Sequence, residues 1–289
     1  MSRYQNDLAW LLQSSDLLAL SRRHSTAELV SRMSLRGAFD YKETHRLGVY
    51  FEQLWQHLTA HCDSLEVTAH NLQVIIDNHT FGEFDSILYD KVFDCSIHCE
   101  LAVKFYLQVG QGDNLSDWVG PNLRDRFDSK YHRLFSHQMK LSDDLAIKDW
   151  LRQQDIYIDE KKVLTRGRLF YPLESFIEED FAYPKEVNSK HLKGFWTTWQ
   201  DFAHLQLSSD IEWFLLPKTY WLSDVTDEEK AELKVIDKKT FLIHGHNERY
   251  PFQKIQQVVG MRGAVEVMRG FIVTEDWLEK AEARVLQPS

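Results

Sequence analysis

The chain has 289 residues, of which 43% are hydrophobic and 27% charged, and its 34 Lys and Arg against 44 Asp and Glu give a formal net charge of −10. This ordinary globular composition excludes a disordered or fibrous protein. The negative charge counts against a protein that coats nucleic acid by charge alone, because phosphate neutralisation supplies most of that affinity. It leaves room for an enzyme that brings a divalent cation to the phosphate.

The cysteines and the first residues indicate a reducing, aqueous compartment. Cys62, Cys95 and Cys99 lack the spacing of metal ligands, so we expect reduced thiols. The opening segment, residues 1–18, mixes charged and polar residues into its apolar positions. It has the character of neither a signal peptide nor a membrane span, and no spanning run follows. We therefore expect a cytoplasmic protein with no membrane partner.

The first half of the chain predicts helices, then strands, then a further helix and strand. Amphipathic patterns over residues 6–60 are typical of helices. Alternating apolar residues then predict three strands, and a basic amphipathic stretch predicts a second helical region. This order favours an α/β fold with a mixed sheet flanked by helices. The later predicted elements are strands at Leu72–Ile76, Phe81–Tyr89 and Cys95–Leu107, a helix at 122–140 and a strand at Leu164–Tyr171.

The second half is rich in aromatic residues and carries weaker patterns. GFWTTW at 194–199 and EWFLLPKTYWL at 212–222 predict further strands. Thr226, with Glu229 three residues on, predicts the capped start of a helix. A strand over Val265–Val273 and a helix from Glu275 complete the chain. No linker marks a boundary, so we predict a core domain over 1–172 and an α+β elaboration or cap over 173–289.

Charged side chains gather on two neighbouring predicted strands. In Cys95–Leu107, alternation places Glu100 and Lys104 on one face, opposite an apolar face. Glu83 and Asp85 of the preceding strand share a face that a short hairpin brings beside Glu100. Clustered carboxylates are costly unless a cation neutralises them, and Mg²⁺ prefers such oxygen ligands. A neighbouring lysine can orient the attacking water and offset charge on a phosphate.

This ordered set resembles the PD-(D/E)XK nuclease superfamily, which has the restriction-endonuclease-like fold. The likeness covers roughly residues 45–140 and rests on GEFD at 82–85, the hairpin, and the strand with a Glu and a Lys on one face. It implies a nuclease that uses Mg²⁺ or Mn²⁺ to hydrolyse phosphodiesters, with DNA as the expected substrate. The implied roles are Asp85 and Glu100 as metal ligands, the Leu101 carbonyl as a further ligand, Lys104 as the catalytic lysine, and Glu52, within Gly48–Glu52, as an accessory acid.

One departure from the superfamily pattern leaves a second function open. The usual acid and lysine are two residues apart, whereas Glu100 and Lys104 are four apart, or about 13 Å along a strand. Ala102 holds the usual acid position. Either Glu100 binds the metal from a shifted position, or the domain has lost catalysis and is a nuclease-like module that binds nucleic acid or a protein partner. A solvated Glu100–Lys104 pair on an open sheet face is the structural alternative.

The helix predicted over 122–140 carries a basic stripe that could follow a phosphate backbone. A solvated helix face, balanced by Asp125 and Asp128, explains the same pattern. The candidate nucleic-acid-binding residues are Arg126, Lys130 and Arg133, with His137 next in the stripe.

Two other features of the sequence bear on identity. His244-Gly245-His246 has no third ligand at a recognisable spacing and is more typical of a surface turn than of a metal site. More narrowly than the superfamily, the whole chain, including RGRLFYP at 166–172, resembles a bacterial family catalogued as domain of unknown function 1853, which brings no established activity.

Overall fold

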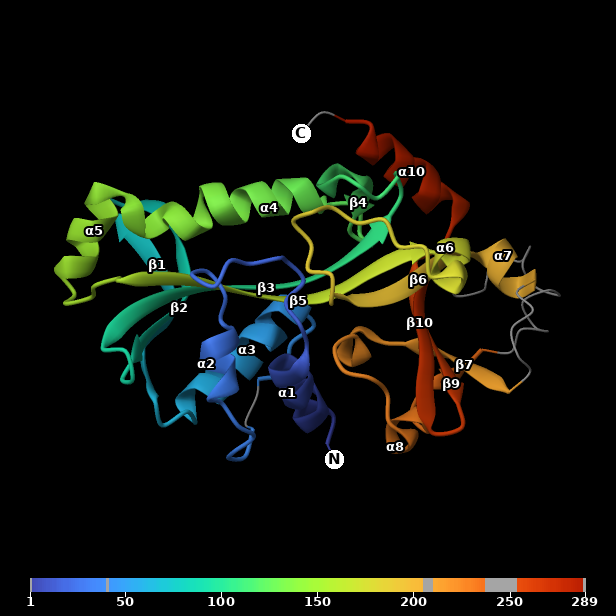
Figure 1. The fold of residues 1–289 in the computed structure, drawn as a ribbon, viewed down its shortest axis with the longest axis horizontal. Coiled ribbons are helices and arrows are strands. Elements are labelled where there is room, and N and C mark those ends of the chain that lie inside the picture. Colours follow the sequence, from blue (N-terminus) through green and yellow to red (C-terminus); the bar gives the residue numbers. More distant parts are fainter. Residues whose placement is uncertain (1, 40–41, 205–209, 237–253, 288–289) are drawn as a thin grey trace. The chain divides into compact units, whose positions relative to one another are not determined.

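The computed structural model describes residues 2–39, 42–204, 210–236 and 254–287. These residues form a mixed α/β fold, with ten strands that pair both parallel and antiparallel and with helices beside them (Figure 1). The predicted α/β class is confirmed. The chain forms two compact units, the first comprising Met1–Lys104, Ser129–Arg166 and Asn188–Lys190, and the second Phe105–Asp128, Gly167–Val187 and His191–Ser289.

The division into units differs from the predicted domains. The change of unit at Arg166 falls just before the predicted boundary at residue 172. Residues 105–128, which we assigned to the first domain, belong to the second unit.

The first unit is built on an antiparallel arrangement of three strands, β1 to β3, with helices packed on them. The strand β3 continues into the second unit from Phe105, and β5 does so from Gly167. Its elements are α1 (Arg3–Gln13), α2 (Ala27–Ser31), α3 (Leu47–Ala60), β1 (Leu65–Ile76), β2 (His79–Asp90), β3 (Cys95–Gln108), most of α4 (Phe127–Ser136), the 3-10 helix η2 (Gln138–Asp143), α5 (Leu145–Arg152) and the first part of β5 (Glu160–Pro172).

A tight turn fixes how β1 and β2 pair. Asp77 and Asn78 both have positive φ, 49° and 61°, and Ile76 pairs with His79. Two left-handed residues in a two-residue loop match the twist of the flanking strands, and Asp and Asn tolerate that conformation. Asp77 and Asn78 therefore account for the two-residue connection between β1 and β2.

Helices cover both faces of these strands. Figure 1 shows α4 and α5 on one side of β1–β3, and α2 and α3 on the other. On the α3 side, the buried Trp55 Nε1 donates to Ser86 Oγ at 3.1 Å. On the α5 side, Ile147 and Leu151 pack against Phe84. Both faces are therefore buried where the helices lie, which an alternating sequence pattern alone does not predict.

In the second unit, parallel and antiparallel strands pair side by side. The strand β6 pairs in parallel with β5 and with β10, and β9 pairs antiparallel with β10 and with β7. The remaining elements are η1 (Leu115–Asp117), β4 (Trp118–Val119), α6 (Leu173–Glu178), β6 (Leu192–Thr198), α7 (Trp199–His204), β7 (Ile211–Leu216), η3 (Lys218–Tyr220), α8 (Asp227–Lys230), β8 (Lys234–Val235), β9 (Gln256–Arg262), β10 (Val265–Val273) and α10 (Glu275–Val285).

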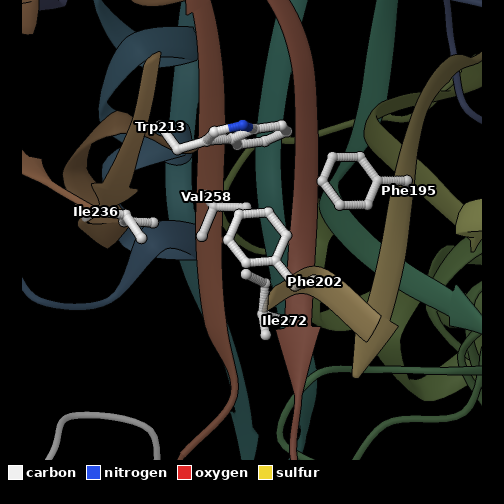
Figure 2. Close-up of a cluster of buried hydrophobic side chains, with 6 residues drawn as sticks. All are labelled: Phe195, Phe202, Trp213, Ile236, Val258 and Ile272. Carbon is white, nitrogen blue, oxygen red and sulfur yellow. The ribbon is translucent and has the colours of Figure 1, made fainter. Parts of the chain in front are cut away.

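Aromatic side chains fill the core of this second unit. The centroid of the Trp213 ring system lies 5.0 Å from that of Phe202 and 5.8 Å from that of Phe195, and both contacts are edge-to-face. Figure 2 shows these rings with Val258 and Ile272. Edge-to-face pairs add to the free energy gained by burying large apolar surfaces. These aromatic residues are core, as the apolar runs in the sequence indicate.

The strand and helices predicted in the C-terminal part of the chain match the structure more closely than the helix predicted over 122–140. The strand over Val265–Val273, the helix from Glu275 and the capping box of Thr226 and Glu229 are confirmed. The helix predicted to begin at 122 begins at Phe127, because Leu123 adopts a positive φ of 63° in a turn before it. We did not predict β9. His244 and His246 lie outside the described residues.

Replacing glycine by alanine should have opposite effects on stability at Gly270 and at Gly48. A Cβ on Gly270 would lie 2.4 Å from the ring of the buried Phe195, whereas a Cβ on Gly48, exposed in α3, would meet nothing within 4 Å. We expect Gly270→Ala to destabilise the protein by about 1–3 kcal/mol through overpacking. We expect Gly48→Ala to stabilise it by about 0.5–1 kcal/mol through backbone entropy. Chemical denaturation of both variants checks this, and a stable Gly270→Ala would contradict it.

Candidate functional site

The chemistry of the first unit centres on Asp85 and Glu100, where β2 and β3 stop pairing. The ladder between the two strands ends at Ser86 with Cys99. Just beyond the ladder, the Leu101 N–H donates to the Asp85 carboxyl group, at 2.8 Å from Oδ2. The Asp85 carboxyl group lies close to that of Glu100, whose negative charge raises the pKa of Asp85. A side chain thus completes the backbone pairing and brings two acids together.

Glu100 is fully buried and held from two sides. Its Oε1 lies 2.8 Å from His98 Nε2, and its Oε2 accepts a hydrogen bond from Gln138 Nε2 at 2.5 Å. The Gln138 Oε1 in turn accepts from Lys130 Nζ at 2.9 Å. An amide therefore links the Glu100 carboxyl group to an ammonium group on α4.

Burial raises the pKa of both acids. The pKa of Asp85 rises from 3.8 to about 7, chiefly through burial and then through the negative charge of Glu100. The pKa of Glu100 rises from 4.5 to about 7, again chiefly through burial, while Lys130 opposes the rise. Two close carboxylates cannot both ionise cheaply without a cation, so they share a proton near neutrality.

The hydrogen bonds indicate which acid keeps that proton. Burial lowers the pKa of His98 to about 4, so its ring is neutral. The His98 Nδ1 is buried and has no hydrogen-bond partner in the described part of the chain. Burying an unpaired acceptor costs less free energy than burying an unpaired N–H, so Nδ1 is the ring nitrogen without the proton. His98 then donates through Nε2, so Glu100 accepts from both His98 and Gln138. The shared proton is best placed on Asp85.

Lys130 is the cation with the largest effect on the pKa values of Asp85 and Glu100. Its charge opposes the rise in the pKa of both Asp85 and Glu100. Burial, and then the charge of Lys104, lowers the pKa of Lys130 itself. Lys104 is half-buried and lies near enough to Lys130 for this effect.

Two further carboxylates border the pair. Glu52 Oε2 accepts from Asn71 Nδ2 at 2.9 Å, and Asn71 also reaches Glu83 at 3.4 Å. The charge of Glu52 raises the pKa of Asp85, and that of Glu83 raises the pKa of Glu100. The structure therefore brings the accessory acid on α3 close to the pair, together with Glu83.

The basic residues predicted to bind nucleic acid do not form one set. Arg133 is exposed, and its charge reaches Glu100. Arg126 is buried, forms two hydrogen bonds to Asp128, and donates to the carbonyls of Arg284 and Gln287. Arg126 precedes α4 and is engaged within the fold, so we leave it out of the candidate surface. The solvated-pair alternative is wrong for Glu100, which has no exposed surface.

The donor set suits a hard divalent cation better than a closed zinc site. Within the described residues, no three His, Cys, Asp or Glu side chains form a group that could hold a metal. Mg²⁺ usually binds one or two protein carboxylates and keeps several waters, whereas structural zinc takes four protein ligands. Asp85 and Glu100 fit the first pattern, and a cation would relieve the cost of their proximity. Leu101 contributes its N–H to Asp85, and its predicted carbonyl ligation stays a prediction.

Only part of this arrangement could be predicted from the sequence. His98 lies two residues before Glu100 on the same strand face, and Lys130 and Gln138 lie on one stripe of the predicted helix. Those spacings were visible. The link from Lys130 through Gln138 to Glu100 depends on the fold bringing α4 and η2 over β3, which no local pattern shows.

Comparison with known proteins identifies the family of the chain. The fold and the acids define a mixed α/β protein in which a half-buried aspartate lies beside a buried glutamate. Residues 6–273 match the family described as Domain of unknown function (DUF1853), and the chain belongs to that family. No curated protein and no solved structure matches the chain. Among the described residues, no helix has the length and apolar character needed to cross a bilayer.

The raised pKa of Asp85 predicts a pH-dependent effect of Asp85→Asn. The folded pKa, about 7, exceeds the ordinary 3.8, so the stability contributed by the bound proton is fully present below pH 4 and is lost as pH rises through 7. Asn has no such proton to lose, and its amide oxygen can still accept from Leu101. We expect Asp85→Asn to gain stability relative to the native protein between pH 5 and pH 8, by an amount on the order of 2 kcal/mol.

Urea denaturation with EDTA at both pH values measures this difference. Asp77→Asn, at an exposed acid in the β1–β2 turn, is the matched control. An Asp85→Asn effect that is equal at pH 5 and pH 8 would contradict the prediction.

Proposed function

We propose that the protein is a Mg²⁺- or Mn²⁺-dependent phosphodiesterase that acts on nucleic acid, with DNA as the expected substrate and a site of the PD-(D/E)XK type on a restriction-endonuclease-like fold. The observation that carries this proposal is the half-buried Asp85 beside the buried Glu100, with a lysine joined to Glu100 through Gln138. Buried charge pairs of like sign are rare unless a function requires them, and perturbed carboxyl pKa values cluster at such sites.

In this proposal each side chain has a distinct task. Asp85 and Glu100 would hold the metal, which when bound activates water and offsets charge on the phosphate. The Leu101 N–H fixes the Asp85 carboxyl, and His98 and Gln138 fix that of Glu100. These contacts limit the motion of both acids and so reduce the cost of organising the ligands.

Lys130 supports activity despite the long Glu100–Lys104 spacing. The superfamily places its lysine two residues after the acid, where Ala102 stands here. In the described structure, an ammonium from α4 lies close to the acids instead, held by Gln138. We propose that Lys130 stabilises negative charge on the phosphate, and that Lys104 adds to the positive potential beside it. Arg133, exposed on the same helix, would contact the sugar–phosphate backbone of the DNA.

The first prediction from this proposal concerns cleavage. With Mg²⁺ or Mn²⁺ and supercoiled plasmid or short single- and double-stranded DNA, we expect metal-dependent cutting. Asp85→Asn should reduce the rate by about 10²-fold or more, because it weakens the metal site. Lys130→Met should reduce it by a similar factor, because it removes positive charge beside the phosphate. Lys104→Met should have a smaller effect. Lys185→Met, at an exposed lysine of the second unit, is the control.

The rates assign the lysine role. A loss in Lys104→Met with full activity in Lys130→Met would return the role to the strand lysine. Absence of cutting on every substrate by the folded protein would favour the alternative, a nuclease-like module that binds nucleic acid or a protein partner.

The second prediction concerns metal binding without turnover. Mn²⁺ should raise the melting temperature, because a ligand at 100 times its Kd adds about 2.7 kcal/mol of stability. Asp85→Asn and Glu100→Gln should each remove most of this gain, while Asp77→Asn should keep it. Thermal melts at pH 8, with and without Mn²⁺, measure the effect. An equal gain in all four proteins would place the metal elsewhere.

A further inference from the structure

A second charged cavity lies in the first unit, apart from the acid pair. It has a volume of about 350 Å³, and buried Leu29 and Ile97 are among its lining residues. Its charged lining includes Arg22, Arg23 and Arg32. Neither Asp85 nor Glu100 borders it, so it needs a separate explanation.

An exposed aromatic ring stands beside this cavity. Phe93, in the turn between β2 and β3, is 56% exposed, and its neighbour Val92 is 59% exposed. The Arg32 guanidinium lies over the ring, 5.6 Å from its centre, and also pairs with the buried Asp90. Asp90 accepts from the Val92 N–H at 2.9 Å. The turn is therefore held firmly while the ring stays accessible.

Two arginines on the cavity wall lack partners. Arg22 and Arg23 are exposed, and neither forms an ion pair with any residue that the structure describes. Their segment is fixed, because Ser25 bridges to Val163 of β5 and the Val163 N–H donates to the His24 carbonyl at 2.7 Å. Two fixed, unpaired arginines are unexpected in a chain with a net charge of −10.

The other charges of the wall largely cancel. Arg32 pairs with Asp90, and Lys162 with Glu160 at 2.9 Å. Glu28 is the remaining acid on the wall, against Arg22 and Arg23. Burial lowers the pKa of the neighbouring His24, and Arg23 and Lys162 lower it further, as expected of a positive potential.

We propose that this cavity binds an unpaired nucleotide, whose base stacks on Phe93 and whose phosphate pairs with Arg22 and Arg23. Aromatic rings bind bases of any sequence by stacking, and arginine pairs with phosphate through two parallel hydrogen bonds. A base within a duplex is already stacked, so an intact duplex does not fit this arrangement. The nucleotide is either part of a single strand or free in solution, because both carry the same base and phosphate.

This inference names a contact for the substrate class of the proposed function, but it does not depend on cleavage. Binding is measured on the full chain in EDTA, where a metal-dependent reaction does not proceed. Asp77→Asn, at an exposed acid that does not line the cavity, should bind as the native protein does. Failure of the nuclease proposal and failure of this one are therefore separate results.

The experiment is fluorescence anisotropy with a labelled eight-nucleotide oligo-dT at about 50 mM salt. We expect Arg22→Glu/Arg23→Glu to weaken binding by about 10-fold or more, and Phe93→Leu by about 10-fold, with Phe93→Tyr near native. Glu28→Gln should strengthen binding about 2-fold or more, since it removes the opposing charge. The control is Lys185→Glu/Lys190→Glu, which makes the same change of charge at exposed lysines that do not line the cavity. This variant should bind the oligonucleotide as tightly as the native protein does.

Competition identifies the source of the nucleotide. Displacement of the probe by AMP at micromolar concentration assigns the cavity to free nucleotides, and resistance to AMP assigns it to a strand. The proposal is overturned if the Arg22/Arg23 and Phe93→Leu variants bind like the native protein, if a duplex of equal length binds as tightly, or if the oligonucleotide does not bind at all.

Discussion

A fully buried glutamate beside a half-buried aspartate is the constraint on which the first unit depends. Burial is the largest cause of the raised pKa of Asp85 and of Glu100, and the negative charge of Glu100 raises the pKa of Asp85 further. The surrounding fold compensates with donors from three directions: a backbone N–H at Leu101, a ring nitrogen at His98 and an amide at Gln138. Removing the acids would leave those donors without acceptors. The site and the local fold therefore stabilise each other.

The same donors explain why β2 and β3 separate where they do. A regular ladder would pair the Leu101 N–H with a carbonyl of β2, and the two acids would then be ordinary cross-strand neighbours. Because the Asp85 side chain accepts that N–H, the strands diverge without leaving a buried donor unsatisfied. Divergence at the end of a ladder gives side chains room to approach a ligand. The polar contact and the opening between strands are thus one structural feature.

The sequence predicted those parts of the fold that depend on local patterns. The strand Val265–Val273 and the capping box at Thr226 follow from alternation and from a hydrogen bond between near neighbours. The convergence of Asp85 and Glu100 followed from hairpin geometry. The position of Lys130 could not be predicted in this way, because it depends on the crossing of α4 over β3, and the pattern within β3 pointed to Lys104. Arg126 illustrates the opposite error: its spacing fits a basic stripe, but contacts with Asp128 and two distant carbonyls hold it within the fold.

The three cysteines differ in their exposure to solvent, and the more accessible one borders the cavity beside Phe93. Cys62 and Cys99 are buried, and burial raises the pKa of the Cys99 thiol far above its ordinary value, so alkylating reagents reach it poorly. Cys95 is only half-buried and borders the cavity that contains Arg22 and Phe93. A thiol reagent would therefore act first at this cavity, and the native chain already carries a selective position for a reporter group there.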